Sequence, residues 1–415
     1  MKHVWHETGA GLICLALGFG FAQATSIGSI GVKIAIALFV GIFGAFVVYV
    51  VNAAKKDGPI QVFLPQWDQE SGGDFYQDGF IQKKGFEQAE REIKKTDKAH
   101  IALNVKYNPM DETTSGKELL KSMKEHYEKG SRYFVMTMSG KVEEVWGGFR
   151  EWRSSLNTIW RWWDKRKAPV LIVTVASAPN LADAKNGIVR WYIRSEEESR
   201  LLADYLSKLG FKSAAAFGVT HHDGTHDSTY GKEGIKQFCE EFEEFGGNVP
   251  DDMRIYVTAK TAKPKIEKFL KEYKKENCPG IFVVGYGDMV KNTLTELVQG
   301  GYEGCIACTS TLTDRQWQPP ETILNKSKVK IFTVLPRLKN PKEHLVDDNR
   351  NVVFFFARKT LLRVLKLTAG NADSNSFLEN WTDGLEEGPD ELKLEYFKCG
   401  DVLVHLHIVS ADKLK

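Results

Sequence analysis

From residue 59 onward the chain alternates short apolar runs with stretches whose apolar side chains recur at helical spacing, and this alternation restricts the fold more than any other feature. The apolar runs predict strands at 60–64, 100–107, 133–138 and 170–175, and then at 214–219, 254–257, 280–285 and 304–308. Strands that alternate with helices favour parallel sheets with right-handed crossovers. We therefore predict an α/β fold with two doubly wound parallel-sheet lobes.

One helix of the second series is marked at both ends. Ser195 followed by Glu198 is the capping-box pattern of a helix start, and Gly210 is typical of a helix end. In open α/β sheets, ligands bind beyond the carboxyl ends of the strands. The residues that directly follow each strand are therefore the candidates for function.

The first fifty residues have a different character. Residues 34–51, IAIALFVGIFGAFVVYVV, carry no charge and are long enough to cross a bilayer as a helix. Lys33 precedes this run, and Lys55 and Lys56 follow it. We predict that residues 1–54 hold one or two membrane segments, one of which is a transmembrane helix.

A second apolar stretch at 9–24 leaves the topology open. It ends in a small-x-small tripeptide at 22–24, which is typical of a secretory signal peptide. The alternative is a first membrane helix that forms a hairpin with the later segment and places Lys2, Lys55 and Lys56 on a cytoplasmic face. We expect a membrane-anchored protein whose large domain is extracytoplasmic (periplasmic), with the cytoplasmic face as the alternative.

The charges of the chain nearly cancel, with 56 Lys and Arg against 54 Asp and Glu. Such a chain has no basic field to attract nucleic acid, so we expect no nucleic-acid partner. The sequence contains no G-x-S-x-G elbow, P-loop, H-E-x-x-H or kinase motif. We therefore expect no enzyme activity and no cofactor.

Two clusters have the residue types of metal or redox sites. Cys305 and Cys308 have C-x-x-C spacing, but they fall within a predicted strand, where alternation sends the two sulfurs to opposite faces. Residues 221–227, HHDGTHD, match no compact zinc-site spacing. We predict two buried thiols and a polar loop, and no metal site.

A predicted helix at 145–166 is dense in tryptophan and arginine. Its tryptophans are Trp146, Trp152, Trp160, Trp162 and Trp163. Aromatic and arginine enrichment is typical of interaction surfaces, including the membrane interface. The helix is predicted either to pack within its lobe or to contact a partner or membrane.

Several segments together carry a family resemblance. YIRSEEESRLLADYLSKLG at 192–210, AAAFGVTHHDGTHDSTYGKEGIKQFCEEFEEFGGNV at 214–249 and GIFVVGYGDM at 280–289 follow the order of crossover, helix, strand, Tyr-Gly helix start, Gly-Gly exit and Gly-Tyr-Gly loop. Segments 63–93 and 170–183 are similar to the first and fourth strands with their loops. From about residue 59 to its end, the chain resembles the type I periplasmic binding proteins, specifically the branched-chain amino-acid receptors of ABC transporters.

The resemblance implies two lobes joined by a three-crossing hinge that close over a small ligand. The first lobe would comprise 59–193 plus 331–397, and the second 194–330 plus 398–415. The crossings would lie near 191–195, between 311 and 330, and near 398–401.

The resemblance also implies ligand-binding residues after the strands. An aromatic ring would face the ligand side chain, hydroxyls and backbone groups would hold a carboxylate, and two tyrosines would close the second lobe. The implied ligand-binding residues are Trp67, Ser139, Thr174, Ala176, Ser177, Tyr230, Tyr286 and Ser310.

The loop after the strand 304–308 departs from the family pattern. Many amino-acid receptors place an acidic residue there to pair the ligand ammonium, whereas this chain has Ser310 between two threonines. A buried ammonium without a partner is costly, so an α-amino acid is in doubt and an amide, a carboxylic acid or another small polar solute fits as well.

These patterns predict a membrane-anchored solute-binding protein that captures a small polar ligand for ABC transport. Its expected partners are the small-molecule ligand, the membrane, and an ABC permease or another membrane protein. The alternative is a sensory, regulatory or structural subunit of a membrane complex that reuses the binding-protein fold.

Overall fold

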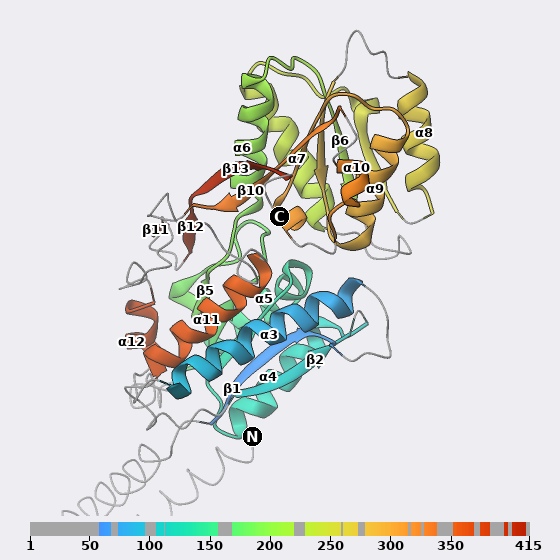
Figure 1. Cartoon of the computed structure of the whole chain (residues 1–415). Helices are drawn as coiled ribbons and strands as arrows, with labels where there is room; N and C mark the ends of the chain where they lie inside the picture. Colours follow the sequence, from blue (N-terminus) through green and yellow to red (C-terminus); the bar gives the residue numbers. More distant parts are fainter. Residues whose placement is uncertain are drawn as a thin grey trace, which may run out of the picture. The chain divides into compact units, whose positions relative to one another are not determined.

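Two sheets dominate the computed structural model (Figure 1). The structure describes residues 58–67, 74–95, 105–111, 113–156, 168–219, 229–258, 260–272, 279–313, 317–324, 328–337, 352–368, 374–381, 394–396 and 401–411. The expected membrane segments within 1–54 and the histidine-rich run 221–227 lie outside these residues. Among the described helices, none combines the length and apolar character that a bilayer crossing needs.

The first sheet has five parallel strands in the order β2-β1-β3-β4-β5. Strands buried on both faces read as continuous apolar runs, which is why β3 and β4 are recognisable in the sequence. The strands are β1 (Ile60–Pro65), β2 (Val105–Met110), β3 (Tyr133–Met136), β4 (Val170–Val173) and β5 (Ile188–Arg190).

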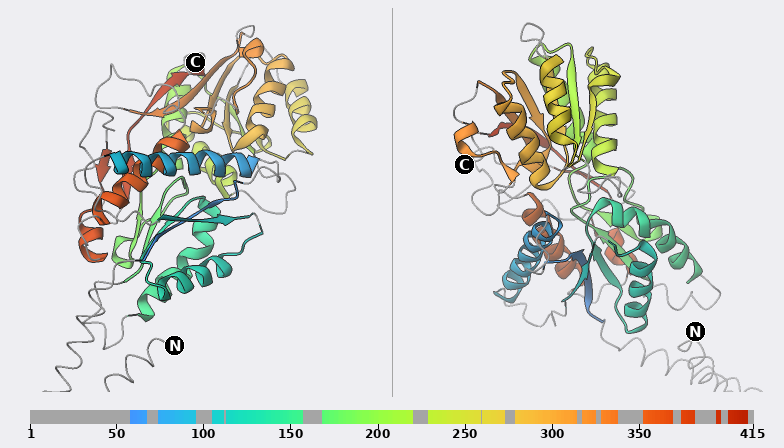
Figure 2. Two further views of the ribbon diagram at one scale, coloured as in Figure 1. Left: turned by 60° about the horizontal axis from the view of Figure 1, so that its bottom comes forward. Right: turned by 90° about the vertical axis from the view of Figure 1, so that its right-hand side faces the viewer.

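Helices cover the first sheet. The last long helix, α11, returns to this sheet from far along the sequence and packs against α3, as the views in Figures 1 and 2 show. Arg358 of α11 donates to both carboxylate oxygens of Glu92 of α3, at 2.8 and 3.0 Å. The helices are α3 (Asp74–Lys95), α4 (Gly116–Glu128), α5 (Ser139–Ser155), α11 (Val352–Thr368) and α12 (Ser374–Glu379).

The second sheet has six strands in the order β13-β10-β9-β8-β6-β7, and only β13 pairs antiparallel. Its strands are β6 (Ala214–Val219), β7 (Arg254–Val257), β8 (Gly280–Val284), β9 (Cys305–Cys308), β10 (Lys330–Pro336) and β13 (Leu406–Ser410). The helices of this lobe are α6 (Ser195–Lys208), α7 (Thr229–Glu244), α8 (Ala262–Glu272), α9 (Gly287–Gln299) and α10 (Glu321–Leu324). A short hairpin of β11 (Leu394–Tyr396) and β12 (Val402–Val404) precedes β13.

The second sheet separates two hydrophobic cores. Cys308 packs in one core with Phe217 and Val283, whereas Cys305 packs in the other with Phe282. Both cysteines are buried, and neither forms a disulfide. The prediction of two buried thiols on opposite faces is confirmed.

The strand β10 lies in the second sheet, although the expected lobe boundary assigned residues from 331 onward to the first lobe. β10 pairs in parallel with β9, with Lys330 opposite Cys305 and Phe332 opposite Ala307. The chain therefore leaves the second sheet only after Pro336, and re-enters it with β13. The boundary therefore lies one strand later in the chain than predicted, because β10 is held in the second sheet by its pairing with β9.

The tryptophan-rich helix α5 begins at Ser139, earlier than the expected start at 145, and ends at Ser155. Trp152 is buried edge-on against Phe149, with ring centroids 5.5 Å apart. The Arg150 guanidinium lies over the Trp146 ring at 4.5 Å. Trp152 therefore serves lobe packing, and the tryptophans at 160, 162 and 163 lie outside the described residues.

Candidate functional site

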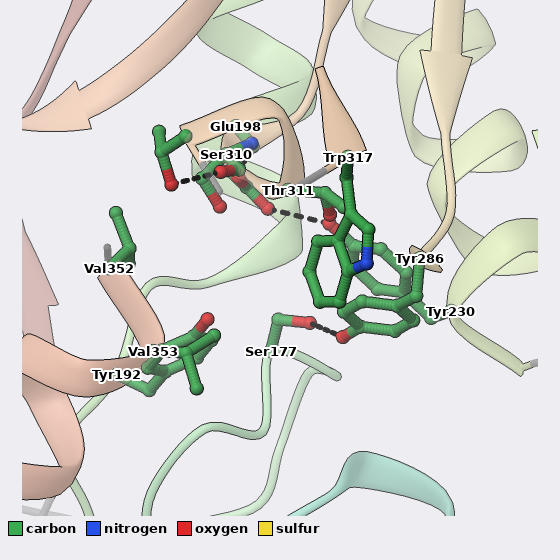
Figure 3. Close-up of a pocket in the computed structure, with 11 residues that line it drawn as sticks. Ser177, Tyr192, Glu198, Tyr230, Tyr286, Ser310, Thr311, Trp317, Val352 and Val353 are labelled. Carbon is green, nitrogen blue, oxygen red and sulfur yellow. Dashed lines mark hydrogen bonds between the residues drawn. The ribbon is translucent and has the colours of Figure 1, made fainter. Parts of the chain in front are cut away.

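One pocket joins residues that the two sheets carry (Figure 3). The cavity between them is about 10 Å³, room for about one water molecule, so a larger ligand requires the lining side chains to move apart. The first lobe contributes Ser177 after β4, Tyr192 after β5, and Val352 and Val353 at the start of α11. The second lobe contributes Glu198, Tyr230, Tyr286, Ser310, Thr311, Thr313 and Trp317.

The backbone turns sharply where β3 and β4 end. Met138 and Val175 have φ angles of 71° and 50°, in the left-handed region that a β-branched residue such as valine rarely adopts. The Met138 amide donates to the Val175 carbonyl at 3.2 Å, so the two strained residues hold each other. Such strain concentrates at binding sites, and Val175 lies two residues before Ser177.

Glu198 is the centre of the polar network on the second lobe. It lies in the first turn of α6 and is 1% exposed. Its Oε1 accepts the Ser310 amide at 2.7 Å, and its Oε2 accepts the Tyr230 hydroxyl at 3.0 Å (Figure 3). The carboxyl group therefore joins α6, α7 and the loop after β9 at the pocket wall.

The capping box predicted from Ser195 and Glu198 is wrong, although the helix does begin at Ser195. The residue before the helix is Arg194, which makes no side-chain cap hydrogen bond. The Ser195 amide, which a capping glutamate would bind, donates instead to the Ser177 carbonyl at 2.9 Å. Because that donor is taken, the Glu198 carboxyl is free to bind Ser310 and Tyr230.

Burial controls the protonation of this network. Desolvation raises the pKa of Glu198, and the hydrogen bonds from Ser310 and Tyr230 oppose part of the rise. Burial and the neighbouring Glu198 carboxyl raise the pKa of Tyr230 well above 10, so its hydroxyl remains a neutral donor. The site thus holds an acid that is costly to ionise without an additional positive partner.

Aromatic rings form much of the remaining wall. Tyr230 and Tyr286 stack with centroids 4.6 Å apart and an interplanar angle of 26°. The Tyr286 hydroxyl lies 3.5 Å from Ser177 Oγ, which connects the second lobe to the first. Trp317 is 2% exposed, and its Nε1 has no hydrogen-bond partner within the described part of the chain.

Glycine and threonine fix the loop that presents Tyr286. Gly287 has a φ of 71° at the start of α9, a conformation that glycine adopts without steric cost. Thr311 Oγ1 donates to the Gly285 carbonyl at 2.7 Å and so ties the loop after β9 to the loop after β8. The two loops consequently hold Tyr286 and Ser310 on one side of the pocket.

The structure brings four of the eight implied ligand-binding residues together, namely Ser177, Tyr230, Tyr286 and Ser310. It places the other four outside the lining of this pocket. Of these, Ala176 is fully buried beside Ser177, in the segment that follows β4.

Three implied residues make contacts within the first lobe. Ser139 Oγ accepts the Ala178 amide at 3.1 Å. Thr174 Oγ1 donates to the Trp191 carbonyl at 3.2 Å and accepts from Thr360. Trp67 is half-buried against Tyr107, with Lys83 Nζ 4.5 Å from its ring. These hydroxyls and this ring thus hold the first lobe together.

Sequence reasoning missed several pocket residues, foremost Glu198. The only signal for Glu198 was a capping pattern, which indicated a structural role. Tyr192 stands in the recognised crossover, where its strand-end position marks it as a candidate, whereas Trp317, Val352 and Val353 follow no predicted strand. Within the described residues, no cluster of three metal-ligating side chains occurs.

The chain is similar to known proteins in structure and not in sequence. No protein-family model and no curated protein sequence matches the chain. The LivJ substrate-binding protein from Streptococcus pneumoniae, in complex with isoleucine, is 13% identical with a TM-score of 0.60, over 85% of this chain and 95% of that one.

Two further solved structures give the same result. A solute-binding protein of an ABC transporter from Rhodopseudomonas palustris, in complex with 3,4-dihydroxybenzoic acid, is 13% identical with a TM-score of 0.61, over 85% of this chain and 93% of that one. The leucine-binding protein LivK from Thermotoga maritima is 12% identical with a TM-score of 0.57, over 85% and 94%. The chain has the fold of the type I periplasmic binding proteins, as its sequence motifs predict.

Proposed function

We propose that the chain is a solute-binding protein, and not an enzyme, that holds a small polar ligand in the pocket of Figure 3. The observation that carries this proposal is the convergence of Ser177 from the first lobe with Tyr286, Tyr230 and Glu198 from the second at one pocket. The proteins of similar fold are substrate- and solute-binding proteins of transporters. Ligand binding is the function that this fold and this wall of buried polar groups support best.

Ligand binding would work through the two lobes. A ligand that touches both Ser177 and Tyr286 stabilises the closed arrangement by its higher affinity for that arrangement. The expected hinge crossing at 191–195 supplies Tyr192 to the pocket wall and leads directly into the helix that carries Glu198. Closure and ligand contact are therefore coupled through one short segment.

The membrane context is part of the proposal. The uncharged run at 34–51 would anchor the protein, with its α/β body on the extracytoplasmic side. There the closed form would be presented to an ABC permease or another membrane protein. A sensory or structural subunit would present the same closed form to a different partner.

A thermal-shift screen of the full chain in detergent tests the proposal. The compounds are amino acids, amides, small carboxylates, benzoates, amines, nucleosides and sugars. A ligand at 100 times its dissociation constant adds about 2.7 kcal/mol to the stability of the folded state. The shift should disappear in Tyr286→Ala and persist in Tyr256→Ala, because Tyr256 is exposed on β7 and outside the pocket.

A well-folded sample that no compound stabilises would contradict ligand binding. It would favour the alternative of a sensory or structural subunit. The same conclusion follows if Tyr256→Ala removes a shift as fully as Tyr286→Ala does.

A further inference from the structure

The charges that line the pocket are of one sign only. Glu198 is the one acid among the lining residues, and the others are aromatic residues, hydroxyl residues and valines, without Lys, Arg or His. On the basis of the proposed function, we propose that the ligand is a small organic cation without a carboxylate, such as an alkylammonium ion. Its charge is held by Glu198, and its carbon atoms contact the surrounding aromatic rings.

The hydrogen bonds of Glu198 leave its charge without a counter-ion. The Ser310 amide and the Tyr230 hydroxyl each donate one bond, and both donors are neutral groups. An ionised carboxylate in such surroundings is costly unless a cation accompanies it. An ammonium group bound beside Glu198 supplies the missing positive charge.

The aromatic rings favour the same ligand. Tyr192, Tyr230, Tyr286 and Trp317 line one pocket with Glu198. The face of an aromatic ring carries partial negative charge, which attracts a cation, and ammonium ligands are often recognised in this way. The rings also offer apolar area to the alkyl part of the ligand.

A carboxylate ligand fits this wall poorly. It would meet Glu198 with no basic side chain among the lining residues to offset the repulsion. Of the first-lobe hydroxyls that would receive a carboxylate, Thr174 donates to the Trp191 carbonyl, and neither Ser139 nor Thr174 is part of the pocket lining. The inference thus separates this chain from its structural neighbours that hold isoleucine and dihydroxybenzoic acid.

Binding of a cation should release a proton at pH values below the raised pKa of free Glu198. Burial raises the pKa of Glu198, whereas a bound ammonium lowers it. The other titratable groups around this carboxyl are Tyr230 on α7, Tyr286 before α9, Tyr192 before α6 and Cys308 on β9. Burial raises the pKa of Tyr230 and of Cys308, so both remain neutral. The affinity for a cation should therefore rise with pH until free Glu198 is ionised.

Four ligands with matched alkyl tails test the inference. They are isoamylamine, leucine, isocaproate and isocaproamide, which carry respectively a cationic, a zwitterionic, an anionic and a neutral head group. Titration calorimetry on the full chain at pH 6 and pH 8 gives each affinity and the protons released. We expect isoamylamine to bind at least about tenfold tighter than the other three, which corresponds to one charge-assisted contact.

Two variants assign the preference to Glu198. Glu198→Gln should lower the affinity for isoamylamine by about tenfold to a hundredfold and abolish the proton release. Glu197→Gln is the matched control, because Glu197 lies on the same helix turn, pairs with Arg200 at 2.8 Å and is not part of the pocket. The control should leave both quantities unchanged.

Each remaining outcome overturns the inference. Tighter binding of leucine, isocaproate or isocaproamide refutes a cation site while it upholds the proposed function. Binding of isoamylamine that Glu198→Gln does not alter refutes the role of Glu198. If none of the four binds, the cation class is refuted, and the unbiased thermal-shift screen then decides separately whether the chain binds any ligand.

Discussion

The buried ion pair beside the expected hinge crossing allows one prediction to be worked out from the geometry. Arg190, the last residue of β5, and Asp401 have side-chain exposures of 0% and 8%. Arg190 Nε donates to Asp401 Oδ1 at 2.8 Å, and its Nη2 donates to Oδ2. Its Nη1 donates to the Ala178 carbonyl, so each of the three guanidinium nitrogens donates a hydrogen bond.

Asp401→Asn should lower the melting temperature strongly. It removes the only charge opposite Arg190 in the described residues and leaves a guanidinium group with no route to water. Breaking one half of a buried pair costs about 3–5 kcal/mol. At about 2–4 °C for each kcal/mol in a unit of about 150–250 residues, the size of one lobe, the melting temperature should fall by on the order of 10 °C.

Thermal unfolding of the full chain, followed by tryptophan fluorescence, measures the effect. Asp251→Asn is the control, because its pair with Arg254 is exposed and such pairs contribute little. The double variant Arg190→Met with Asp401→Leu should regain most of the loss, since apolar residues can replace a buried pair. A melting temperature for Asp401→Asn within about 2 °C of the unmodified chain would refute the reasoning, because exposed pairs give effects of that size.

Three further predictions concern the pocket, the core and the topology. Burial raises the pKa of folded Glu198, so this carboxyl lowers stability as the pH rises from its unfolded pKa toward its folded pKa. In melting curves between pH 4 and pH 8, Glu198→Gln should therefore gain stability relative to the unmodified chain as the pH rises. A stability difference that does not change with pH would contradict this. Trp152→Ala should cost about 3–5 kcal/mol in urea unfolding because the ring is buried against Phe149, and a cost below that of an exposed substitution would exclude its core role. A reporter fused after Lys415 and active only outside the cytoplasm should be active, and an inactive but folded fusion would contradict the transport proposal.

The strands were predictable where burial on both faces made the sequence continuously apolar. The predicted strands 170–175 and 214–219 include β4 and β6, which are buried along their whole length. The strand β10 was not predicted, because buried positions along it are interrupted by exposed or partly exposed ones. Its partners β9 and β13 also come to lie on either side of it only in the folded chain. Local pattern therefore predicts a strand better than it predicts the sheet to which the strand belongs.

The pocket was less predictable than the fold, because hydrogen-bond donors are shared over long sequence distances. The role of Glu198 depends on Ser177, whose carbonyl takes the helix-start amide that a capping glutamate would bind. Ser139 follows a strand, which is the position expected of a ligand hydroxyl, but its Oγ accepts the Ala178 amide. Neither competition is visible in the residues next to Glu198 or Ser139.

The placement of the described cysteines has a consequence for the chemistry of the second lobe. Cys305 and Cys308 are neighbours in the sequence but lie in different cores, so the sheet itself separates their sulfurs. Burial raises the pKa of Cys239 to about 11 and that of Cys308 as well, which removes the thiolate that disulfide exchange requires. Cys239 and Cys308 are consequently poor nucleophiles toward oxidants and exchange partners, in an oxidising and in a reducing compartment alike.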